Sequence, residues 1–444
     1  MMHKPWKFIV TSALLASCGT SIAVPFNSFD PRSMAMGGAG VAVGDAKIAP
    51  FFNPALLTIT PEEDDFTLAL PIVGVRAYDP QDFATSLDNF QNGNYVTNLQ
   101  SSIDTYNNVS PTPANLSAIS TNTSTLSTQF TTLSDKPIQA ELGAAMVVGI
   151  PSKSIGAAFY ANGWGAAGGI VKYRDSQTLA DLSYAMDTVA SCQTNPLQPV
   201  CATITTDPRI TTYYSAGQVT FNTNNLQSSV DIRGVALSEV GIALSREFTL
   251  ADSAWGLGIT PKMVNATLFD YTADVNSGST SNATDSDYTA KYSGFNFDLG
   301  LAKDHENGWR SGFVIKNVIP QNYDFKRIPA GAAPGSAQIT TGTLKLKPQA
   351  RIGASHSTSW STVAMDLDLT ANDPAGFENK SQYLALGGEL NAWGWAQLRA
   401  GYRANLKDNA RNVTSLGVGL GPLDVTVAGN SNEYGASIAL GFTF

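Results

Sequence analysis

The amino-acid sequence predicts an all-β protein, a transmembrane antiparallel β-barrel of about 14 strands with a helical insert on its outer side. Three observations predict this fold class. Segments of about ten residues alternate apolar and polar side chains, as strands with one face in lipid do. The connections between them alternate between short and long. Charged residues are scarce, at 14% of 444 residues, against roughly 25% in a soluble domain.

Composition also excludes several classes of protein. After the N-terminus there is no run of about 18 apolar residues, so helical membrane spans are not expected. The net charge is −9, whereas nucleic-acid binding needs a basic surface, so no direct nucleic-acid contact is expected. The length suits either two or three ordinary domains or one large barrel.

The N-terminus, residues 1–23, has the form of an export signal. Lys4 and Lys7 precede a short apolar stretch, and Ser21-Ile22-Ala23 is a small-x-small cleavage site. An alternative is that the segment ending at Cys18 is a lipobox and that Cys18 becomes lipidated. Either route takes the protein out of the cytoplasm, and a barrel of this kind belongs in the outer membrane of a Gram-negative bacterium.

Period-two alternation locates the strands, most clearly in the C-terminal part of the chain. Within 360–370, 394–404 and 433–444, every second side chain is apolar and the others are polar, charged or small. The strands expected are 66–77, 138–150, 154–162, 231–247, 254–268, 287–302, 309–319, 344–356, 360–370, 381–391, 394–404, 412–420, 423–429 and 433–444.

Connection lengths distinguish a membrane barrel from a soluble sandwich, which has no reason to sort its loops. The short connections are 151–153, 248–253, 303–308, 357–359, 392–393 and 421–422. Those between them are 78–137, 163–230, 269–286, 320–343, 371–380, 405–411 and 430–432, of which only the last is tight. Short periplasmic turns and long outer loops alternate in outer-membrane barrels, and an even strand number places both ends of the barrel in the periplasm.

Phe444 ends the last alternating strand. A terminal aromatic residue in this context resembles the C-terminal signal that the outer-membrane assembly machinery recognises. Outer-membrane lipid and this machinery are therefore expected partners.

Two long outer segments have features of their own. Residues 80–135 are polar but carry apolar side chains at helical spacing, so we expect amphipathic helices folded over the mouth of the barrel. They are either a cap or contact surface, or a solvated loop that shields the barrel. Residues 163–230 contain Cys192 and Cys201, which we expect to form a local disulfide. A redox or metal pair would want closer spacing or more ligands. An extra protruding hairpin is expected at 210–221.

A glycine-rich run and an NPA segment precede the first strand. They contain Met36, Gly37, Gly38 and Gly40, followed by Asn53, Pro54 and Ala55. This segment resembles the N-terminus of FadL-type outer-membrane barrels, and the resemblance implies that residues 24–61 fold inside the lumen as a plug, ahead of a barrel spanning 62–444. Phosphate binding is not expected, because no strand–GxGxxG–helix context or GK[ST] follows.

Within that superfamily, the chain is most similar to the barrel proteins described as conjugal transfer protein TraF. The shared features are FFNPALL at 51–57, the polar helical insert and the hairpin around 417–424. The resemblance implies transport of a hydrophobic small molecule or association with conjugation-system proteins. The thioredoxin-like protein also called TraF is a different family, and this chain lacks the C-x-x-C that its redox function requires.

Catalysis finds little support in the sequence, and we expect neither an enzyme nor a cofactor or metal site. His356 beside Ser355 and Ser357 is the only raw material for a hydrolase, and no hydrolase or nucleotide motif is present. Six charged residues are expected to face the lumen. They are either a salt-bridge network or the lining of a permeation path, and they are Arg351, Asp366, Asp368, Glu389, Arg399 and Arg403.

The sequence therefore supports two hypotheses. The first is a non-enzymatic barrel for transport or conjugative transfer, with an apolar cavity between plug and insert if it takes up a hydrophobic solute. The second is a structural or adhesive barrel whose insert at 80–135 binds a protein or cell-surface partner.

Overall fold

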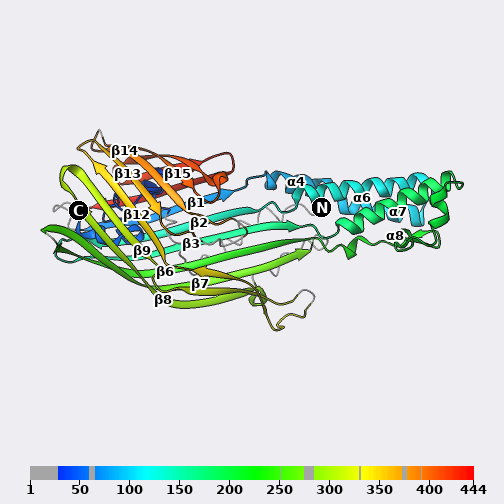
Figure 1. Ribbon diagram of the computed structural model, residues 1–444, viewed down its shortest axis with the longest axis horizontal. Coiled ribbons are helices and arrows are strands. Elements are labelled where there is room, and N and C mark those ends of the chain that lie inside the picture. Colours follow the sequence, from blue (N-terminus) through cyan, green and yellow to red (C-terminus); the bar gives the residue numbers. More distant parts are fainter. Residues whose placement is uncertain are drawn as a thin grey trace.

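A computed structural model describes residues 29–59, 66–250, 252–274, 285–329, 332–372, 377, 379–391 and 393–444. The predicted signal peptide, Cys18 and residues 24–28 lie outside the described residues. The chain forms a barrel from which a helical bundle projects at one end (Figure 1).

Fourteen antiparallel strands close into one barrel, in the order β1-β18-β17-β16-β15-β14-β13-β12-β9-β8-β7-β6-β3-β2. Each barrel strand overlaps one of the fourteen predicted ranges, so the predicted fold class is confirmed. The strands are β1 (Thr67–Tyr78), β2 (Ile138–Ile150), β3 (Gly156–Lys172), β6 (Ser229–Leu250), β7 (Ser253–Asp274), β8 (Thr289–Asp304), β9 (Trp309–Lys316), β12 (Gln349–Ser357), β13 (Ser361–Asp368), β14 (Tyr383–Leu390), β15 (Ala396–Asn405), β16 (Val413–Leu420), β17 (Leu423–Gly429) and β18 (Glu433–Thr443).

The barrel wall is uneven in height. Strands β6 and β7 have 22 residues each, whereas β9 and β13 have 8. We call β3, β6, β7 and β8 the tall wall and β9 and β12–β18 the short wall. The long strands run toward the helical bundle in Figure 1. The predicted ranges 154–162 and 254–268 stop short of this extension, because the small and polar residues there do not keep a clean alternation.

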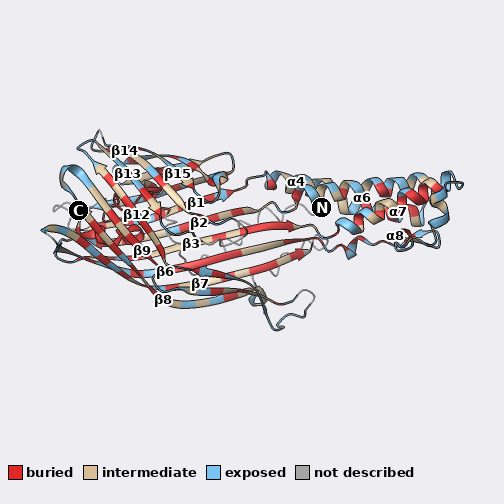
Figure 2. Cartoon of the chain, in the orientation of Figure 1, coloured by how far each residue is buried: buried red, intermediate tan, exposed pale blue. Residues whose placement is uncertain are grey.

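The outer surface of the strands is apolar. Along β6, for example, Val240, Ile242 and Leu244 are exposed, while Gly241 and Ala243 between them are buried. Buried and exposed positions follow one another along the barrel strands in Figure 2, as the period of two requires. None of the helices in the described part of the chain combines the length and apolar character of a membrane span.

One predicted strand is wrong in part. The range 344–356 divides into β11 (Ile339–Leu346), which lies outside the barrel order, and the barrel strand β12. Pro348 has no N–H for a ladder and separates the two. Strand β11 pairs with β10 (Gln321–Arg327), and β10 packs against β7 and β8. The long connection 317–348 thus contains a hairpin that alternation alone did not separate from the barrel.

The two longest outer connections fold together into one helical bundle, which we call the arm. Its long helices are α4 (Phe83–Gly93), α5 (Tyr95–Asn108), α6 (Pro113–Leu133) and α7 (Ser176–Thr194). Shorter elements complete it: η2 (Pro199–Thr203), α8 (Pro208–Thr211), β4 (Tyr214–Ser215), β5 (Gln218–Val219) and η3 (Thr223–Asn225). The arm projects away from the barrel rather than folding over its mouth, so that expectation is wrong (Figure 1).

The arm has a hydrophobic core of its own. Leu99, Ile103 and Leu126, which are among the apolar residues at helical spacing in 80–135, are buried there against Leu182 and Met186 of α7. Helix α7 was not predicted, and it packs against α6 and completes the apolar core of the arm. The predicted hairpin at 210–221 is reduced to the two-residue strands β4 and β5.

A disulfide and a tyrosine pair lie where α5 and α7 end. Cys192 and Cys201 are bonded, as predicted. The hydroxyls of Tyr106 and Tyr214 are 3.1 Å apart, and Gln193 donates to both. Burial, together with the hydrogen bond to Tyr106, raises the pKa of Tyr214 to about 12.

Residues 29–59 lie inside the barrel, and we call them the inner segment. It contains α2 (Pro31–Ala35), α3 (Ala49–Phe52) and η1 (Pro54–Thr58). Helix α2 contacts β15–β18, and η1 contacts β3, β6, β7 and β8, so the segment reaches both walls. Three further turns are η4 (Ser286–Tyr288), η5 (Glu306–Gly308) and η6 (Asn409–Arg411).

Candidate functional site: the inner segment and the charged barrel wall

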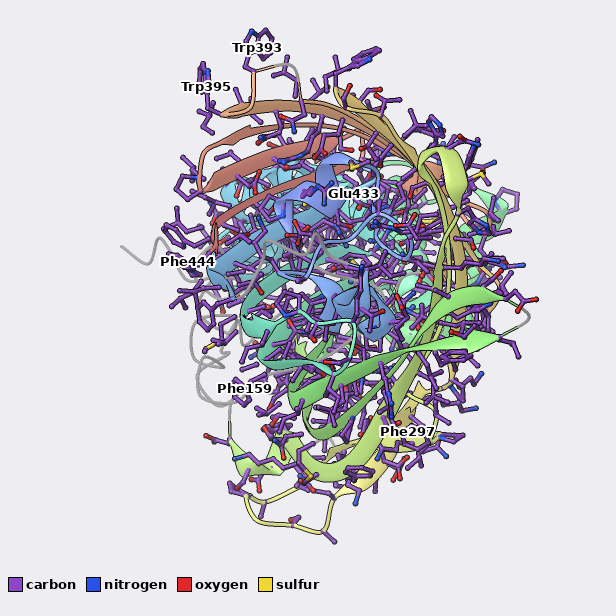
Figure 3. The ribbon with its side chains drawn as sticks, turned by 90° about the vertical axis from the view of Figure 1, so that its left-hand side faces the viewer. Phe159, Phe297, Trp393, Trp395, Glu433 and Phe444 are labelled. Atoms are coloured by element: carbon purple, nitrogen blue, oxygen red, sulfur yellow. A yellow bond between two sulfur atoms is a disulfide. The ribbon has the colours of Figure 1, made fainter. Side chains whose placement is uncertain are left out.

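The inner segment lies against a ring of glycines on the barrel wall. Figure 3 looks into the barrel and shows this segment, in blue, enclosed by the strands. A Cβ atom added at any of these glycines would come within 2.0–2.5 Å of an atom of the inner segment. We call them the glycine belt: Gly74, Gly143, Gly258, Gly300, Gly312, Gly387, Gly401 and Gly417.

Several members of the belt pair directly across neighbouring strands. Gly74 faces Gly143, Gly258 faces Gly300, and Gly387 faces Gly401. A Cβ on Gly401 would lie 2.2 Å from the backbone N of Gly37, which cannot move aside as a flexible side chain can. At these points of closest approach the wall therefore has no side chains, which lets the two backbones come together.

The predicted glycine run forms the turn after α2. Gly37 and Gly38 have φ of 70° and 96°, a region that side chains other than glycine rarely adopt. Met36 is fully buried against Gly387. Gly40 packs against the ring of Phe52, where a Cβ would lie 2.3 Å from the ring.

The predicted Asn-Pro-Ala motif forms the start of η1. Asn53 caps this turn by accepting a hydrogen bond from the N–H of Ala55 at 3.1 Å. Its amide nitrogen donates to the carbonyls of Val41 and of Leu301 on β8, both at 3.0 Å. Asn53 thus ties the two parts of the inner segment to each other and to the tall wall, with Pro54 as the first residue of the turn.

The first part of the inner segment, 30–43, is held to the short wall by polar contacts. Arg32 makes a bidentate ion pair with Glu389 on β14, at 2.9 and 3.0 Å. The N–H groups of Gly40 and Val41 both donate to one oxygen of Asp366, at 2.8 and 2.9 Å. Further bonds reach backbone carbonyls: Ser415 to Ala35, Thr426 to Pro31, Ser355 to Ala42 and Arg351 to Gly38.

The second part, 46–59, is held mainly by apolar packing. Phe51, Phe52 and Leu57 are buried in one cluster with wall residues that include Val147 and Tyr160. The rings of Phe51 and Tyr160 meet edge to face, with centroids 5.6 Å apart. Small wall residues complete the cluster: Ala69, Ala158, Ala243, Ala302 and Ala439.

The six predicted lumen charges divide among separate contacts. Arg351 pairs with Asp368 at 2.6 Å, and Arg399 pairs with Glu389 at 2.7 Å. Asp366 binds the inner segment, Arg403 pairs with Glu433, and Arg399 also pairs with Asp424. The structure thus links four of the six in two pairs and gives Asp366 and Arg403 other partners.

Sequence reasoning missed a cluster of five charged residues. Arg76, Arg403 and Arg411 surround Glu141 and Glu433, and all but Arg403, a little more open, are at most 5% exposed at the side chain. Glu433 lies inside the ring of strands in Figure 3. The alternation of inward and outward side chains along β1 and β2 could have placed Arg76 and Glu141 in the lumen. Nothing in the sequence shows, however, that residues from β1, β2, β15, β18 and η6 meet.

A second missed cluster lies on the tall wall. The Lys262 ammonium contacts Glu239 at 2.6 Å and Asp298 at 2.9 Å, and all three side chains are at most 1% exposed. Lys316 donates to the carbonyl of Phe51 at 3.0 Å, which adds a polar tie to the second part of the inner segment. Alternation along β6, β7 and β8 could have placed Glu239, Lys262 and Asp298 in the lumen, but it does not show that the three meet.

The residues considered for catalysis do not come together. Ser355 donates to the inner segment from one face of β12. The His356 side chain is on the other face of this strand, where its ring lies against that of Trp309 on β9, with centroids 4.9 Å apart. Among the described residues, no group of His, Cys, Asp or Glu is arranged to hold a metal ion. The predicted apolar cavity between plug and insert stays a prediction. The cavity described at the inner segment is a different one, with three arginines in its lining and no residue of the arm.

These observations define a class of protein: a closed antiparallel β-barrel with an apolar outer surface and its own N-terminal segment inside the lumen. Over residues 50–368 the chain matches the family described as "F plasmid transfer operon, TraF, protein", and it belongs to that family. The predicted resemblance is confirmed.

Solved structures similar to this chain are barrels described as channels or transporters. The CymD monoaromatic hydrocarbon channel is 13% identical, with a TM-score of 0.49 and coverage of 95% of this chain and 99% of that one. The Ralstonia pickettii toluene transporter TbuX is 12% identical, with a TM-score of 0.46 and coverage of 94% and 99%. A Pseudomonas aeruginosa FadL homologue is 10% identical, with a TM-score of 0.36 and coverage of 96% and 99%. No curated protein matches the chain.

Proposed function

We propose that the barrel sits in the outer membrane, with the short turns in the periplasm and the arm outside. The apolar outer faces of the strands support this placement, because charged side chains on a lipid-facing strand are costly. Exposed aromatic residues gather at the end with short turns, as an interfacial girdle would. Trp393, Trp395 and Phe444 point away from the barrel there (Figure 3). Phe444 keeps its proposed role as an assembly signal.

We propose that the inner segment is a plug and that the barrel is a gated, non-enzymatic passage for a small hydrophobic solute. The observation that carries this proposal is the glycine belt. The lumen holds one continuous stretch of chain, and at the points of closest approach to that stretch the wall residues are glycines. Displacing the segment would leave space at the belt, because the belt glycines have no side chains to refill it.

The apolar inner face of the outer half of the tall wall is an argument for a hydrophobic solute. Its inner face presents Trp164, Leu237 and Leu268, covered by Phe325 and Leu346 of the β10–β11 hairpin. An apolar molecule entering from outside would meet this surface before the inner segment. The hairpin would have to shift to admit it.

A deletion of residues 29–43 tests the gate, because it removes the polar part and keeps the apolar anchor. In planar bilayers the deletion is expected to produce a steady ion conductance that the full chain lacks. In proteoliposomes it should change the rate of toluene or oleate uptake. If the deletion variant keeps native mobility on gels and neither conductance nor uptake changes, the proposal that the inner segment is a gate is rejected.

A second candidate function is contact with a conjugation-system protein or another cell through the arm. The observation that favours it is the arm's own core, which lets it stand clear of the barrel. Deleting 80–135 alone would uncover α7, so 80–136 and 174–227 should be removed together. Loss of mating with an intact barrel supports this function, whereas normal mating rejects it.

A further inference from the structure

Two cationic side chains lie on the outward face of the barrel, near the end with the short turns. Arg246 shares the outward face of β6 with the exposed side chains of Ile242 and Leu244. Lys303 shares the outward face of β8 with that of Leu299. In the described barrel strands every aspartate and glutamate lies at an inward position, so no strand carboxylate accompanies the two cations on this face.

Strand pairing places the two cations on either side of β7. Arg246 is opposite Leu257 in the register of β6 and β7, and Leu257 is opposite Leu301 of β8. Lys303 follows Leu301 on the same face of β8. Two strand spacings of about 4.8 Å and an offset of about 6.6 Å along the strand put the Cα atoms of the two cations about 12 Å apart. Both side chains are long enough to reach one group between them.

Arg246 is surrounded by apolar side chains. Leu244 and Phe248 flank it along β6, and Leu257 lies opposite it on β7. In the described part of the chain the Arg246 side chain makes no ion pair or hydrogen bond, not even with Asp252 of the turn after β6. A cation on a lipid-facing strand is unfavourable unless it lies at the interface, where an anionic group can meet it.

Lys303 is accompanied by a tryptophan. Its ammonium lies over the ring of Trp255, 5.0 Å from the centroid. Trp255 precedes Leu257 on the same face of β7, so its ring lies on the strand between the two cations. Tryptophan rings prefer the headgroup level of a membrane. The carboxylate next to Lys303 is engaged elsewhere, because Asp304 pairs with Arg310 at 3.3 Å.

We propose that Arg246 and Lys303 bind the phosphate group of an anionic phospholipid in the periplasmic leaflet, with Leu257 beneath its acyl chains. The site is continuous with the apolar outward face of the strands, which favours a membrane lipid over a soluble anion. Two cations without an outward carboxylate favour a headgroup with a net negative charge over a zwitterionic one. The inference rests on the proposed placement of the short turns in the periplasm.

Native mass spectrometry of the full chain in detergent tests the lipid preference. Palmitoyl-oleoyl phosphatidylglycerol and phosphatidylethanolamine are added in equal amounts. Each basic residue near an anionic headgroup contributes a factor of about five, so an excess of the phosphatidylglycerol adduct of about 25-fold is expected. An excess of inorganic phosphate should leave that adduct in place. Equal binding of the two lipids overturns the proposal, and so does displacement by phosphate, because the site then recognises a free anion.

Variants on the two strands locate the site. Arg246→Gln combined with Lys303→Gln is expected to bring the two lipid adducts close to equality. Lys291→Gln removes a lysine from the same outward face of β8, at the far end of the strand, and should keep the preference. A preference that survives the double variant refutes the assignment.

A measurement on the unaltered chain covers a double variant that does not assemble. Photoactivatable phosphatidylglycerol is expected to crosslink within 244–257 and 299–303, and crosslinks confined to other segments overturn the proposal. Vesicles of the same two lipids separate this proposal from the placement of the barrel. If the chain inserts with native heat-modifiable mobility but shows no lipid preference, the lipid site fails and the placement stands. If the chain does not insert, both fail.

Discussion

The two parts of the inner segment meet the barrel in opposite ways. Residues 30–43 lie on the short wall and rely on ion pairs and on side chains that bind backbone groups. Residues 46–59 lie mostly against the tall wall and bury aromatic and aliphatic side chains. Polar contacts can be exchanged for water contacts at small net cost, whereas exposed apolar surface costs free energy in proportion to its area. The difference indicates that the first part releases more easily and the second part is the anchor.

The largest effect is expected when a side chain is introduced into the glycine belt beneath the first part, residues 30–43. In Gly387→Val, the new Cβ would lie 2.4–2.6 Å from the Cβ, Cα and carbonyl oxygen of Met36. We expect a loss of about 3 kcal/mol in stability or displacement of residues 30–43, measured by heat-modifiable mobility on gels. Gly388→Val is the matched control, since its nearest atom would be 4.0 Å away. Equal behaviour of the two variants would show that the belt does not hold the segment.

Truncation of a side chain in the anchor, residues 46–59, should have the second-largest effect. Phe52→Ala removes a ring that is 1% exposed, and deletion of a buried Phe side chain costs about 3–5 kcal/mol. Maleimide labelling of Thr58→Cys should accelerate strongly, while labelling of Ser33→Cys should change little. If Ser33→Cys gains more than Thr58→Cys, the anchor has been assigned to the wrong part.

Removal of the main ion pair should produce the reverse pattern. Glu389→Gln leaves Arg32 and Arg399 without their shared carboxylate, at a cost of about 3 kcal/mol. Labelling of Ser33→Cys should now accelerate more than labelling of Thr58→Cys. Glu247→Gln on β6 removes the same charge away from the pair and controls for a general effect of charge. Uniform acceleration at both positions would mean that the segment moves as one body.

The smallest effect on the barrel is expected from the arm. Cys192→Ser with Cys201→Ser removes the disulfide that closes the loop after α7, at a cost of about 2 kcal/mol to the arm. Proteolysis of the arm should become faster. Heat-modifiable mobility and both labelling rates should stay at their original values, and a change in either would show that the arm is coupled to the inner segment.

The strands were predictable from the sequence because alternation is local. Every barrel strand overlaps an expected range, and errors fall where a second rule intervenes. Pro348 divides one alternating run between two sheets, and the tall wall extends past the range over which alternation is regular. The outer connections were predicted less completely. Helix α7 carries Leu179, Leu182, Met186 and Val189 at helical spacing, a local signal that was missed, whereas its packing against α6 has no local signal.

The contacts between charged residues in the lumen were less predictable from the sequence than the strands. Parity placed Arg351, Asp366, Glu389 and Arg399 on candidate inner faces without naming their partners. The Arg76–Glu141–Arg403–Arg411–Glu433 cluster joins residues separated by up to 357 positions, and only barrel closure brings them together. Arg32 belongs to the segment that the glycine run and the NPA motif placed in the lumen, but its partner Glu389 lies 357 positions away in the sequence.

The length of the tall-wall strands determines how far the arm extends from the membrane. A 22-residue strand is about 73 Å long at about 3.3 Å per residue, or about 55 Å in height at a tilt near 40°. An apolar band is about 25 Å tall, which leaves about 30 Å of strand beyond the lipid. Helix α6, with 21 residues, adds about 30 Å. The far end of the arm would then stand about 60 Å above the lipid surface.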